Sequence, residues 1–502
     1  MAQATVYTRA QSGLDAPEVS VEVEVAGGLP ALTIVGLVET AVRESRERVR
    51  AAIKAAGFEF PSGRITINLG PANLPKAGSR FDLAIAIGIL AATSQVTPKR
   101  LADHEFFGEL SLSGRLRHVP ALLPALIATR RSGRQCVLPA ACAEEAALLP
   151  GAAIGLAAQL LDVVRYLRGD AELSVPESLA RAGASPGEPD LADVRGQHLA
   201  RRALEIAAAG GHHLLLVGPP GTGKSMLARR MPGLLPELND EEALQSAALA
   251  SLAGRPAEGL SRMPPFRSPH HTATPAALAG GGHGTRPGEM SLAHNGVLFL
   301  DELPEFPRAA LEALREPLEA GTITIARVRR TVSFPARFQL LAAMNPCPCG
   351  FAGDRRRECR CSPDQAQRYR GRVSGPLLDR LDLKVGLNWE PPLAETGQDC
   401  ESSDAVRRRV AAARRCQAGR GGIVNACLGR TAVKAFCQPD PAGRKVLADA
   451  AEQRRLSARA CDRVLRVART VADLDGRPLL QVPDIAEALA LHKAWPDLAG
   501  GP

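Results

Sequence analysis

The feature that most constrains this chain is HLLLVGPPGTGKSMLARR, residues 213–230. An apolar run is followed by a glycine-rich loop and then by a helical pattern, and Gly218 to Ser225 fit G-x-x-x-x-G-K-S. In such a loop the backbone N–H groups surround phosphates, the lysine reaches the β- and γ-phosphate oxygens, and the serine hydroxyl binds Mg²⁺. We therefore expect an α/β domain that binds ATP and Mg²⁺. The expected nucleotide-binding residues are Gly218, Pro219, Pro220, Gly221, Thr222, Gly223, Lys224 and Ser225.

Two further apolar runs end in polar side chains. GVLFLDE (296–302) predicts a strand that ends in Asp301 and Glu302. Asp301 would hold Mg²⁺ through water, and Glu302 would polarise the water that attacks the γ-phosphate. FQLLAAMN (338–345) predicts a neighbouring strand whose last residue, Asn345, could orient that water. Together with the glycine loop, these residues indicate ATP hydrolysis and not nucleotide binding alone.

Four cysteines follow the Asn345 strand as two C-x-C pairs that are nine residues apart. Four thiolates can hold a structural zinc ion in a tetrahedral site. The alternatives are reduced, unligated thiols or an oxidation-labile pair, whereas an iron–sulfur cluster would have no partner chemistry in this chain. Zinc is the favoured interpretation, and it would hold Arg355 to Arg357 beside the hydrolysis machinery. The candidate ligands are Cys347, Cys349, Cys359 and Cys361.

The chain is too long for a single core, and two Pro- and Gly-containing stretches at 181–190 and 388–404 predict linkers. The N-terminal part alternates like strands at 19–28 and 64–70, with a helical pattern at 39–57 between them, and the C-terminal part has helical periodicity throughout. We expect an α/β domain at 1–172, a P-loop α/β domain at 190–390 and a helical lid domain at 400–498.

Charge and hydropathy limit the kinds of partner that the chain can have. It has no run of 18 apolar residues and no basic-then-apolar N-terminal signal, so we expect a cytoplasmic protein without a membrane partner. The formal net charge is +9, and residues 401–502 hold 18 basic and 11 acidic side chains. This excess fits a polyanionic partner, although solvated helix faces alone could account for it.

The motifs resemble those of a known family. DVRGQ (193–197), GPPGTGKS, LFLDE, AAMN, GPLLDR (375–380) and SAR (457–459) occur in the order of an AAA+ ATPase. Within that group the chain resembles the magnesium-chelatase/MCM branch. Over essentially its whole length it looks like the ComM/YifB family of magnesium chelatase-like proteins. The segments FRSPHHTATPAALAGGG (266–282) and MNPCPCGFAGD carry this resemblance most specifically.

The resemblance implies a ring, expected to be a hexamer, with ATP between subunits. By position in the motifs, Arg380 would be the arginine finger that reaches a neighbour's γ-phosphate, and Gln197 of DVRGQ would contact the nucleotide. Arg459 would be the second sensor arginine, with Arg463 one helical turn away as the alternative. A surface salt bridge is the competing interpretation for each arginine.

Residues 73–90 and 108–126 resemble the proteolytic domain of Lon. However, the position of the Lon serine is Arg80, and the position of its lysine is Leu123. Ser79 is one register off, and no basic residue lies in 119–128 to activate it. A serine without a base is a poor nucleophile, so we expect a Lon-like fold without peptidase activity.

Three kinds of motor, which differ in their substrate, are possible interpretations: a DNA translocase or helicase, a chelatase motor subunit and a protein remodeller. Arg327, Arg329 and Arg330 lie in a predicted hairpin (319–338) that projects toward the pore in related ATPases, which favours nucleic acid. Segment 276–289 has no aromatic residue of the kind that protein remodellers use. The resemblance implies branch migration on single-stranded or branched DNA during natural transformation. His270 and His271 are interpreted as polar loop residues or DNA-facing donors.

Overall fold

The computed structural model describes residues 2–177, 189–255, 259–282, 286–327, 330–354, 356–389 and 401–492. Both predicted linkers fall largely outside these ranges. The chain forms two compact units. The first holds Met1–Gly183, Asp240–Ser261 and Thr324–Phe334, and the second holds Ala184–Asn239, Arg262–Ile323 and Pro335–Pro502. The predicted division at 1–172, 190–390 and 400–498 stays a prediction.

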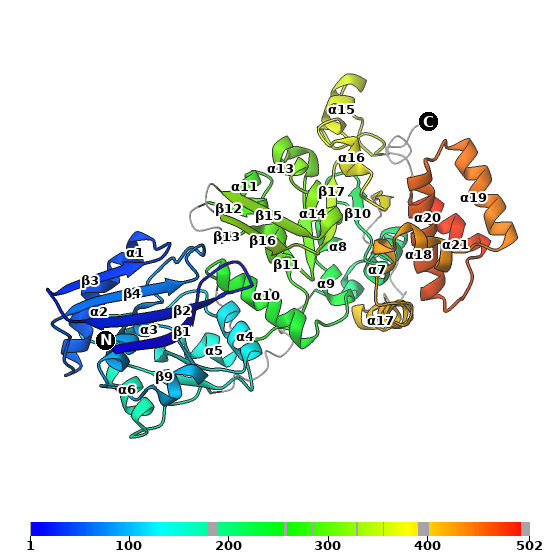
Figure 1. Ribbon diagram of the computed structural model, residues 1–502. Coiled ribbons are helices and arrows are strands. Elements are labelled where there is room, and N and C mark those ends of the chain that lie inside the picture. The colour runs from blue at the N-terminus through cyan, green and yellow to red at the C-terminus, as the bar shows by residue number, and fades with distance from the viewer. Residues whose placement is uncertain are drawn as a thin grey trace. The chain divides into compact units, whose positions relative to one another are not determined.

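The first unit is built on a seven-stranded mixed sheet with the order β3-β4-β2-β1-β5-β8-β9 (Figure 1). The pairs β1/β2 and β2/β4 are antiparallel, and the other pairs are parallel. Its inward-facing valines and isoleucines alternate with exposed residues, as expected of a sheet with one buried face. The strands are β1 Ala2–Arg9, β2 Glu18–Ala26, β3 Ala31–Val35, β4 Arg64–Gly70, β5 His104–Phe106, β8 Gln135–Pro139 and β9 Ile154–Ala157, with a small hairpin of β6 Glu109–Leu110 and β7 Leu116–Arg117.

One helix of the first unit comes from a distant part of the sequence. Helix α10 follows the glycine loop in the chain, yet Leu244, Ala247 and Ala248 share a core with Leu122 and Leu126. Helix α3 is buried along its whole length, which explains why its sequence is apolar after Asp82. The helices of this unit are α1 Thr40–Arg43, α2 Ser45–Ala55, α3 Asp82–Ala92, α4 Leu123–Ser132, α5 Ala143–Ala147, α6 Leu160–Arg168 and α10 Asp240–Leu252.

The side chains at the positions of the Lon catalytic residues make structural contacts within the first unit. The Ser79 hydroxyl donates a hydrogen bond to the Glu109 carboxylate. Arg80, at the position of the Lon serine, is buried and donates to the Gln11 side chain over 3.1 Å and to the Pro120 carbonyl over 3.0 Å. A carboxylate is a weak base for a hydroxyl, so this geometry agrees with the expected lack of peptidase activity, which stays a prediction.

The second unit contains a five-stranded parallel sheet with the order β11-β14-β17-β10-β18 (Figure 1). Its central strands are apolar and buried on both faces, as parallel strands usually are. Because the strands are parallel, their carboxyl ends lie along one edge of the sheet, where ligands bind in such folds. The strands are β10 Leu214–Val217, β11 Phe266–Arg267, β14 Val297–Leu300, β17 Gln339–Met344 and β18 Leu383–Gly386.

Helices surround this sheet, and the last of them in the described residues ends at Leu491. The predicted α/β class with a helical C-terminal region is confirmed, since α17 to α21 share one core with α7 and the sheet. The helices are α7 His198–Gly210, α8 Lys224–Ala228, α9 Met231–Leu234, α11 Pro275–Ala279, α12 Glu289–Leu292, α13 Arg308–Glu312, α14 Arg315–Ala320, α15 Pro363–Arg370, α16 Gly375–Leu378, α17 Ser403–Gly419, α18 Arg430–Phe436, α19 Pro441–Gln453, α20 Ala458–Leu474 and α21 Val482–Leu491. The described residues also include two short strand pairs: β12 Gly280–Gly281 with β13 Arg286–Pro287, and β15 Thr322–Arg327 with β16 Arg330–Pro335.

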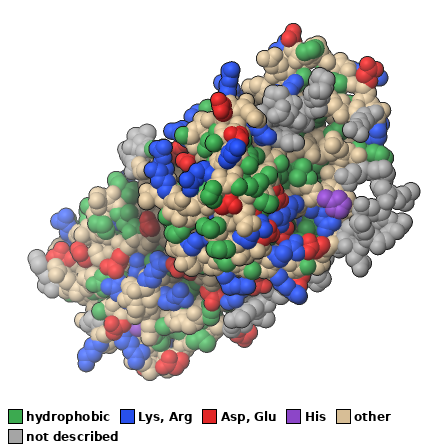
Figure 2. All heavy atoms as spheres, turned by 90° about the vertical axis from the view of Figure 1, so that its right-hand side faces the viewer, with side chains coloured by type: hydrophobic (Ala, Val, Ile, Leu, Met, Phe, Trp, Pro, Cys, Tyr) green, Lys and Arg blue, Asp and Glu red, His purple; other side chains and the backbone are tan. Residues whose placement is uncertain are grey.

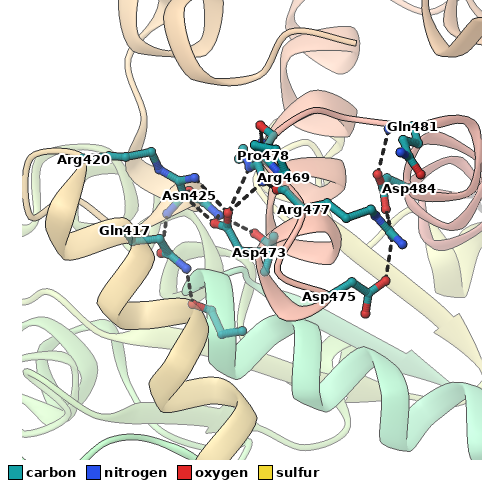
Figure 3. Close-up of polar contacts among 12 residues, drawn as sticks. Gln417, Arg420, Asn425, Arg469, Asp473, Asp475, Arg477, Pro478, Gln481 and Asp484 are labelled. Carbon is teal, nitrogen blue, oxygen red and sulfur yellow. Dashed lines mark hydrogen bonds and ion pairs between the residues drawn. The ribbon is translucent and has the colours of Figure 1, made fainter. Parts of the chain in front are cut away.

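A buried polar network holds the C-terminal helices together (Figure 3). Arg469, fully buried on α20, donates to Asp473 Oδ1 over 3.0 Å and to the Pro478 carbonyl over 2.6 Å. Arg420 pairs with the same aspartate at 2.8 Å, and Asn425 donates to it over 2.8 Å. Buried charges require such complete pairing, because an unpaired one would be strongly destabilising.

The network continues to the P-loop strand. His212, buried just before β10, lies 2.8 Å from Thr470 Oγ1 of α20 and 3.1 Å from Asp382 Oδ2. Burial opposes the charged form of Asp382, but the hydrogen bond from His212 and the neighbouring cations hold its pKa below the usual range. The side chain of Gln417 also donates to the Ala209 carbonyl over 2.9 Å. The helical region is therefore tied to the connection between α7 and β10, at Ala209 and His212, and to the segment that precedes β18.

No helix within the described ranges is long and apolar enough to cross a membrane.

On the face turned toward the viewer in Figure 2, basic side chains lie among acidic ones. On that face the basic side chains therefore do not mark a binding patch by themselves.

Candidate nucleotide-binding site

The glycine loop lies between β10 and α8, at the carboxyl edge of the parallel sheet. Gly221 and Gly223 adopt φ angles of 79° and 86°, the left-handed region that favours glycine. A Cβ on Gly218 would lie 2.6 Å from the Leu387 carbonyl oxygen, so only glycine fits there. The pattern of glycines is therefore required by the backbone path of the loop.

Lys224 points back into this loop. Its Nζ donates to the carbonyls of Gly218 and Pro219 over 2.7 and 2.8 Å and lies 3.1 Å from Asn345 Oδ1. Burial lowers the pKa of Lys224 to about 8, and the nearby charges of Asp301 and Glu302 oppose that shift. The ammonium thus joins the glycine loop to the end of β17, the place where a γ-phosphate is expected. A phosphate's negative charge would favour the protonated form of this lysine.

Ser225 and Asp301, the two residues expected to hold magnesium, lie next to each other. Ser225 Oγ donates to Asp301 Oδ2 over 2.5 Å, and Asp301 Oδ1 accepts the Glu302 backbone N–H over 3.0 Å. A hydroxyl and a carboxylate from neighbouring elements are the hard oxygen donors that Mg²⁺ prefers, and the ion keeps several waters in such sites. The donor set present here therefore fits Mg²⁺ bound together with nucleotide phosphates.

Glu302 has a partner that the sequence did not reveal. Its backbone is left-handed, with φ 53° and ψ 47°, and its Oε2 lies 3.1 Å from His271 Nδ1. The His270 ring lies 4.1 Å from that of His271, while His270 Nδ1 lies 2.9 Å from Thr272 Oγ1. Only the strand order could have predicted this contact, because SPHHTAT follows β11, which is the neighbour of β14. Only the parallel register brings the two segments together.

Arg380 follows α16 and is bonded within its own chain. Its Nη1 donates to the Pro376 carbonyl over 2.6 Å, and its Nη2 pairs with Glu319 of α14. Its Nε is buried, and no described residue accepts a hydrogen bond from it. A single chain does not test whether this guanidinium serves a neighbouring subunit, so the finger role stays a prediction.

The two candidates for the second sensor differ in environment. Arg459 is exposed in the first turn of α20. Arg463 is 12% exposed and lies 3.6 Å from Asp379, the residue before Arg380. The structure thus brings Arg463, and not Arg459, beside the finger motif, although neither role is tested. Gln197 also lies at the site's margin, where its side chain donates to the Asn388 carbonyl over 2.6 Å.

Comparison with known proteins places this architecture in a family. Family models described as magnesium chelatase subunit ChlI match residues 21–142 and 190–392, and one for the ChlI C-terminal part matches 400–492. The uncharacterised protein YifB of Escherichia coli is 47% identical over 98% of this chain and 97% of its own length. The competence protein ComM of Haemophilus influenzae is 46% identical over 97% of each chain.

The chain belongs to the ComM/YifB family of magnesium chelatase-like proteins. This confirms the resemblance of the motifs. A magnesium-chelatase 67 kDa subunit of Heliobacterium mobile is also similar, at 29% identity, but over only 32% of this chain and 29% of its own length. The similarity to ComM and YifB therefore extends well beyond the part shared with that subunit.

The four cysteines of this family member converge on one point. Their sulfur atoms all lie within 4.8 Å of one another. Cys347 Sγ is 3.4 Å from Cys349 Sγ and 3.6 Å from Cys359 Sγ. Sulfurs bound to one tetrahedral zinc at about 2.3 Å lie roughly 3.8 Å apart, so a small relaxation would accommodate the ion. The donor chemistry and spacing fit a closed structural site.

The cysteine loop also contacts the P-loop. Gly350 has a φ of 86°, and a Cβ on it would lie 2.6 Å from Pro220 Cδ, so the two loops are packed together. Farther along, the guanidinium of Arg356 lies 4.0 Å from the centre of the Trp389 ring, just beyond β18. Arg355 lies outside the described residues. An ion that orders this loop would thereby also support the nucleotide site.

The structure describes the arginines that are expected to bind DNA only in part. Arg329 lies outside the described residues, and so do the side chains of Arg327 and Arg330. The hairpin that carries them is present as β15 and β16, and Val332 and Phe334 are buried within the first unit. A Cβ on Gly13 would lie 3.0 Å from Val332. The hairpin's base is thus packed on the N-terminal segment, while the role of the arginines stays a prediction.

Proposed function

We propose that this chain is a ring-forming AAA+ ATPase that couples ATP hydrolysis to movement on DNA. Its biological role would be branch migration during the integration of DNA in natural transformation. The observation that carries the DNA assignment is the similarity to the competence protein ComM over 97% of both chains. The ATPase assignment rests on the contacts of Lys224, Ser225 and Asp301 described above.

Each residue of the site would have a separate role in hydrolysis. Lys224 would neutralise the β- and γ-phosphate oxygens, and Ser225 and Asp301 would hold Mg²⁺, which supplies further charge neutralisation when it is bound. Glu302 would accept the proton of the attacking water, and Asn345, fixed by its contact with Lys224, would orient that water. Catalysis of this kind is largely positioning and electrostatic stabilisation.

The site of one chain is incomplete in this scheme. Arg380 of a neighbouring subunit would supply the last positive charge to the γ-phosphate, with Arg459 or Arg463 as the second sensor. Hydrolysis would then require a closed ring, proposed to be a hexamer, because the developing phosphoryl charge lacks this cation in a free subunit.

A chelatase-type motor is the second candidate, and the family description as magnesium chelatase subunit ChlI favours it. A protein remodeller is the third. The two alternatives share the ATP site and differ in the substrate. The ATPase rate should therefore be measured without polymer and with single-stranded, duplex and branched DNA. Stimulation by DNA together with migration of a branch point supports the proposal, whereas an ATPase that is indifferent to all three DNAs contradicts it.

Replacing Arg327, Arg329 and Arg330 with Ala should weaken DNA binding and flatten its dependence on salt. Each phosphate contact that is lost releases fewer counterions, so the log–log slope should fall by about 0.9 per contact for duplex DNA. The ATPase rate without DNA should persist, because these residues lie outside the glycine loop. Binding titrations at several salt concentrations measure the slope.

A matched control removes three exposed arginines from the first unit, Arg43, Arg46 and Arg130. It changes the net charge equally and should leave the salt slope near that of the parent. If the hairpin variant keeps the full slope and still moves branched DNA, the hairpin is not the gripping element.

We propose further that the cysteine cluster holds a structural zinc ion. Purified protein should contain about one zinc per chain, and Cys347→Ser with Cys349→Ser should abolish it. Because Gly350 packs on Pro220, loss of the ion should also weaken ATP binding. Elemental analysis and nucleotide titration measure the two effects, and Cys416→Ser, at an exposed cysteine elsewhere, is the control. A metal-free protein that is folded and fully active would decide for unligated thiols.

A further inference from the structure

The order of the strands indicates where the base of a bound nucleotide would lie. In the sheet, β10 lies between β17 and β18. The contact of Lys224 with Asn345 puts the expected γ-phosphate position on the β17 side of the glycine loop. Because a nucleoside triphosphate is an extended molecule, we expect its sugar and base on the opposite side, beyond the carboxyl end of β18.

The residues that follow β18 are fixed against the glycine loop and the start of α7. The Leu387 N–H donates to the Val217 carbonyl over 2.7 Å. The side chain of Gln197, the residue before α7, donates to the Asn388 carbonyl over 2.6 Å. The next residue is Trp389, whose indole is 39% exposed although it is a large aromatic side chain. An aromatic ring with free surface therefore lies on the side where the base is expected.

The cysteine loop holds this indole from one side. The guanidinium of Arg356 lies 4.0 Å from the centre of the Trp389 ring, and a cation at that place is attracted by the electron-rich face of the ring. Arg356 is itself fixed by Asp354, whose side chain is 3% exposed. Asp354 Oδ1 accepts the Arg356 backbone N–H over 2.7 Å, and Oδ2 lies 3.6 Å from the guanidinium. The position of the ring is thus tied to the loop that carries the four cysteines.

We propose, on the basis of the ATP site proposed above, that Trp389 stacks on the base of the bound nucleotide. Arg356 is then a positioning residue that holds the indole for this contact. A two-ring purine covers more of an indole than a one-ring pyrimidine does, so Trp389 would favour purine nucleotides. Binding of the base and ordering of the cysteine loop would also favour each other, as linked equilibria require.

The first test compares ligands with and without a base, using ADP, UDP and pyrophosphate, which avoid hydrolysis of ATP during the measurement. Trp389→Ala should raise the Kd for ADP roughly five- to a hundredfold, the range for one base–aromatic stack. The Kd for pyrophosphate should not change, because the phosphate contacts lie in the glycine loop. The preference for ADP over UDP should fall toward one, and Trp389→Phe, which keeps a flat ring, should restore most of it. Calorimetric titration of the full chain with Mg²⁺ measures all three constants.

A second set of variants tests the positioning role of Arg356. Arg356→Ala should raise the Kd for ADP about two- to fivefold, the range for one exposed cation–aromatic contact, and Arg356→Lys should restore part of the affinity. Arg357→Ala is the matched control, since that guanidinium lies 5.1 Å from the centre of the Phe351 ring within the same loop. It removes the same charge and should leave the Kd near that of the parent. An equal loss in the Arg357 variant would overturn the positioning role.

The fluorescence of the ring reports the contact directly. The chain has two tryptophans, Trp389 and Trp495, so Trp495→Phe leaves Trp389 as the only one. In that variant ADP should quench the emission, whereas pyrophosphate should not. Single-stranded DNA added without nucleotide should also leave the emission unchanged. Quenching by DNA and not by ADP would overturn the proposal and assign the indole to a base of the polymer.

Failure of the stacking contact can be distinguished from failure of the proposed function. If the parent binds neither ADP nor pyrophosphate, the ATP site is wrong and the stacking contact is wrong with it. If Lys224→Ala weakens both ligands while Trp389→Ala weakens neither, the ATP site stands and only the stacking contact is wrong. Equal weakening of ADP and pyrophosphate in Trp389→Ala would also overturn it, because the ring would then support the loop and not the base. An ATPase that is indifferent to DNA but shows the loss specific to ADP would leave the stacking contact in place.

Discussion

Glu302→Gln should reduce ATP turnover by at least about 10²-fold while the protein still binds ATP and assembles. The amide keeps the size of the carboxylate but cannot accept the proton of the attacking water. Lys224→Ala should also abolish hydrolysis, but through weaker phosphate binding, because Lys224 supplies the positive charge inside the glycine loop. The measurements are the steady-state ATPase rate, the amount of nucleotide retained after gel filtration, and the particle mass by light scattering.

Glu305→Gln is the matched control for this experiment. Glu305 is an exposed acid three residues further along and pairs with Arg372 at 2.9 Å. Its replacement should leave turnover close to that of the parent. If Glu302→Gln hydrolyses ATP at the parental rate, the water-polarising role is wrong, whatever the Lys224 variant does.

The local part of the site could be predicted from the sequence because each piece is continuous in the chain. The glycine loop carries its own strand and helix, so residues 213–230 specify both the backbone path and the ligand. Asp301 and Asn345 each follow a short apolar run of the kind that is typical of a buried strand. Parallel pairing then brings their ends to one edge, and the contacts of Ser225 with Asp301 and of Lys224 with Asn345 follow.

The non-local part could not be predicted in the same way. His271 and Glu302 are 31 positions apart, and their contact depends on β11 being the neighbour of β14. The packing of Gly350 on Pro220 likewise joins segments that share no periodicity. Hydrophobic pattern shows that a residue is buried but not which surface buries it. Contacts of this kind require the three-dimensional arrangement.

Helix α10 illustrates the same limit at the level of whole elements. It follows the glycine loop in the chain, so sequence order alone would group it with the P-loop strand and helix. In the structure its alanine and leucine face belongs to a core of the first unit. An apolar stripe on a helix predicts that the helix is buried but does not identify its partner. The choice is made by the complementary surface that α4 and α5 present.

Arg380→Ala should bind ATP normally but lower hydrolysis by about 10³-fold, the lower end of the range for arginine fingers. The bound nucleotide would keep Lys224, Ser225 and Asp301, so the ground state would change little. The transition state would lose the cation that meets the charge developing on the γ-phosphate. Arg380→Lys should rescue little, because an ammonium does not reproduce the planar fork of donors that a guanidinium offers. ATPase rates and nucleotide affinities measured on the same preparations separate the two effects.

A mixing experiment decides whether this arginine acts within or between subunits. Lys224→Ala subunits retain the finger but lack the phosphate lysine, and Arg380→Ala subunits have the opposite defect. If the finger acts on a neighbour, mixed rings contain some interfaces with an intact glycine loop on one side and an intact Arg380 on the other. Turnover should therefore exceed that of either variant alone and pass through a maximum as the mixing ratio varies. If rings of verified mixed composition show no recovery at any ratio, Arg380 acts within its own chain. Its bond to Glu319 would then be the structural salt bridge of the competing interpretation.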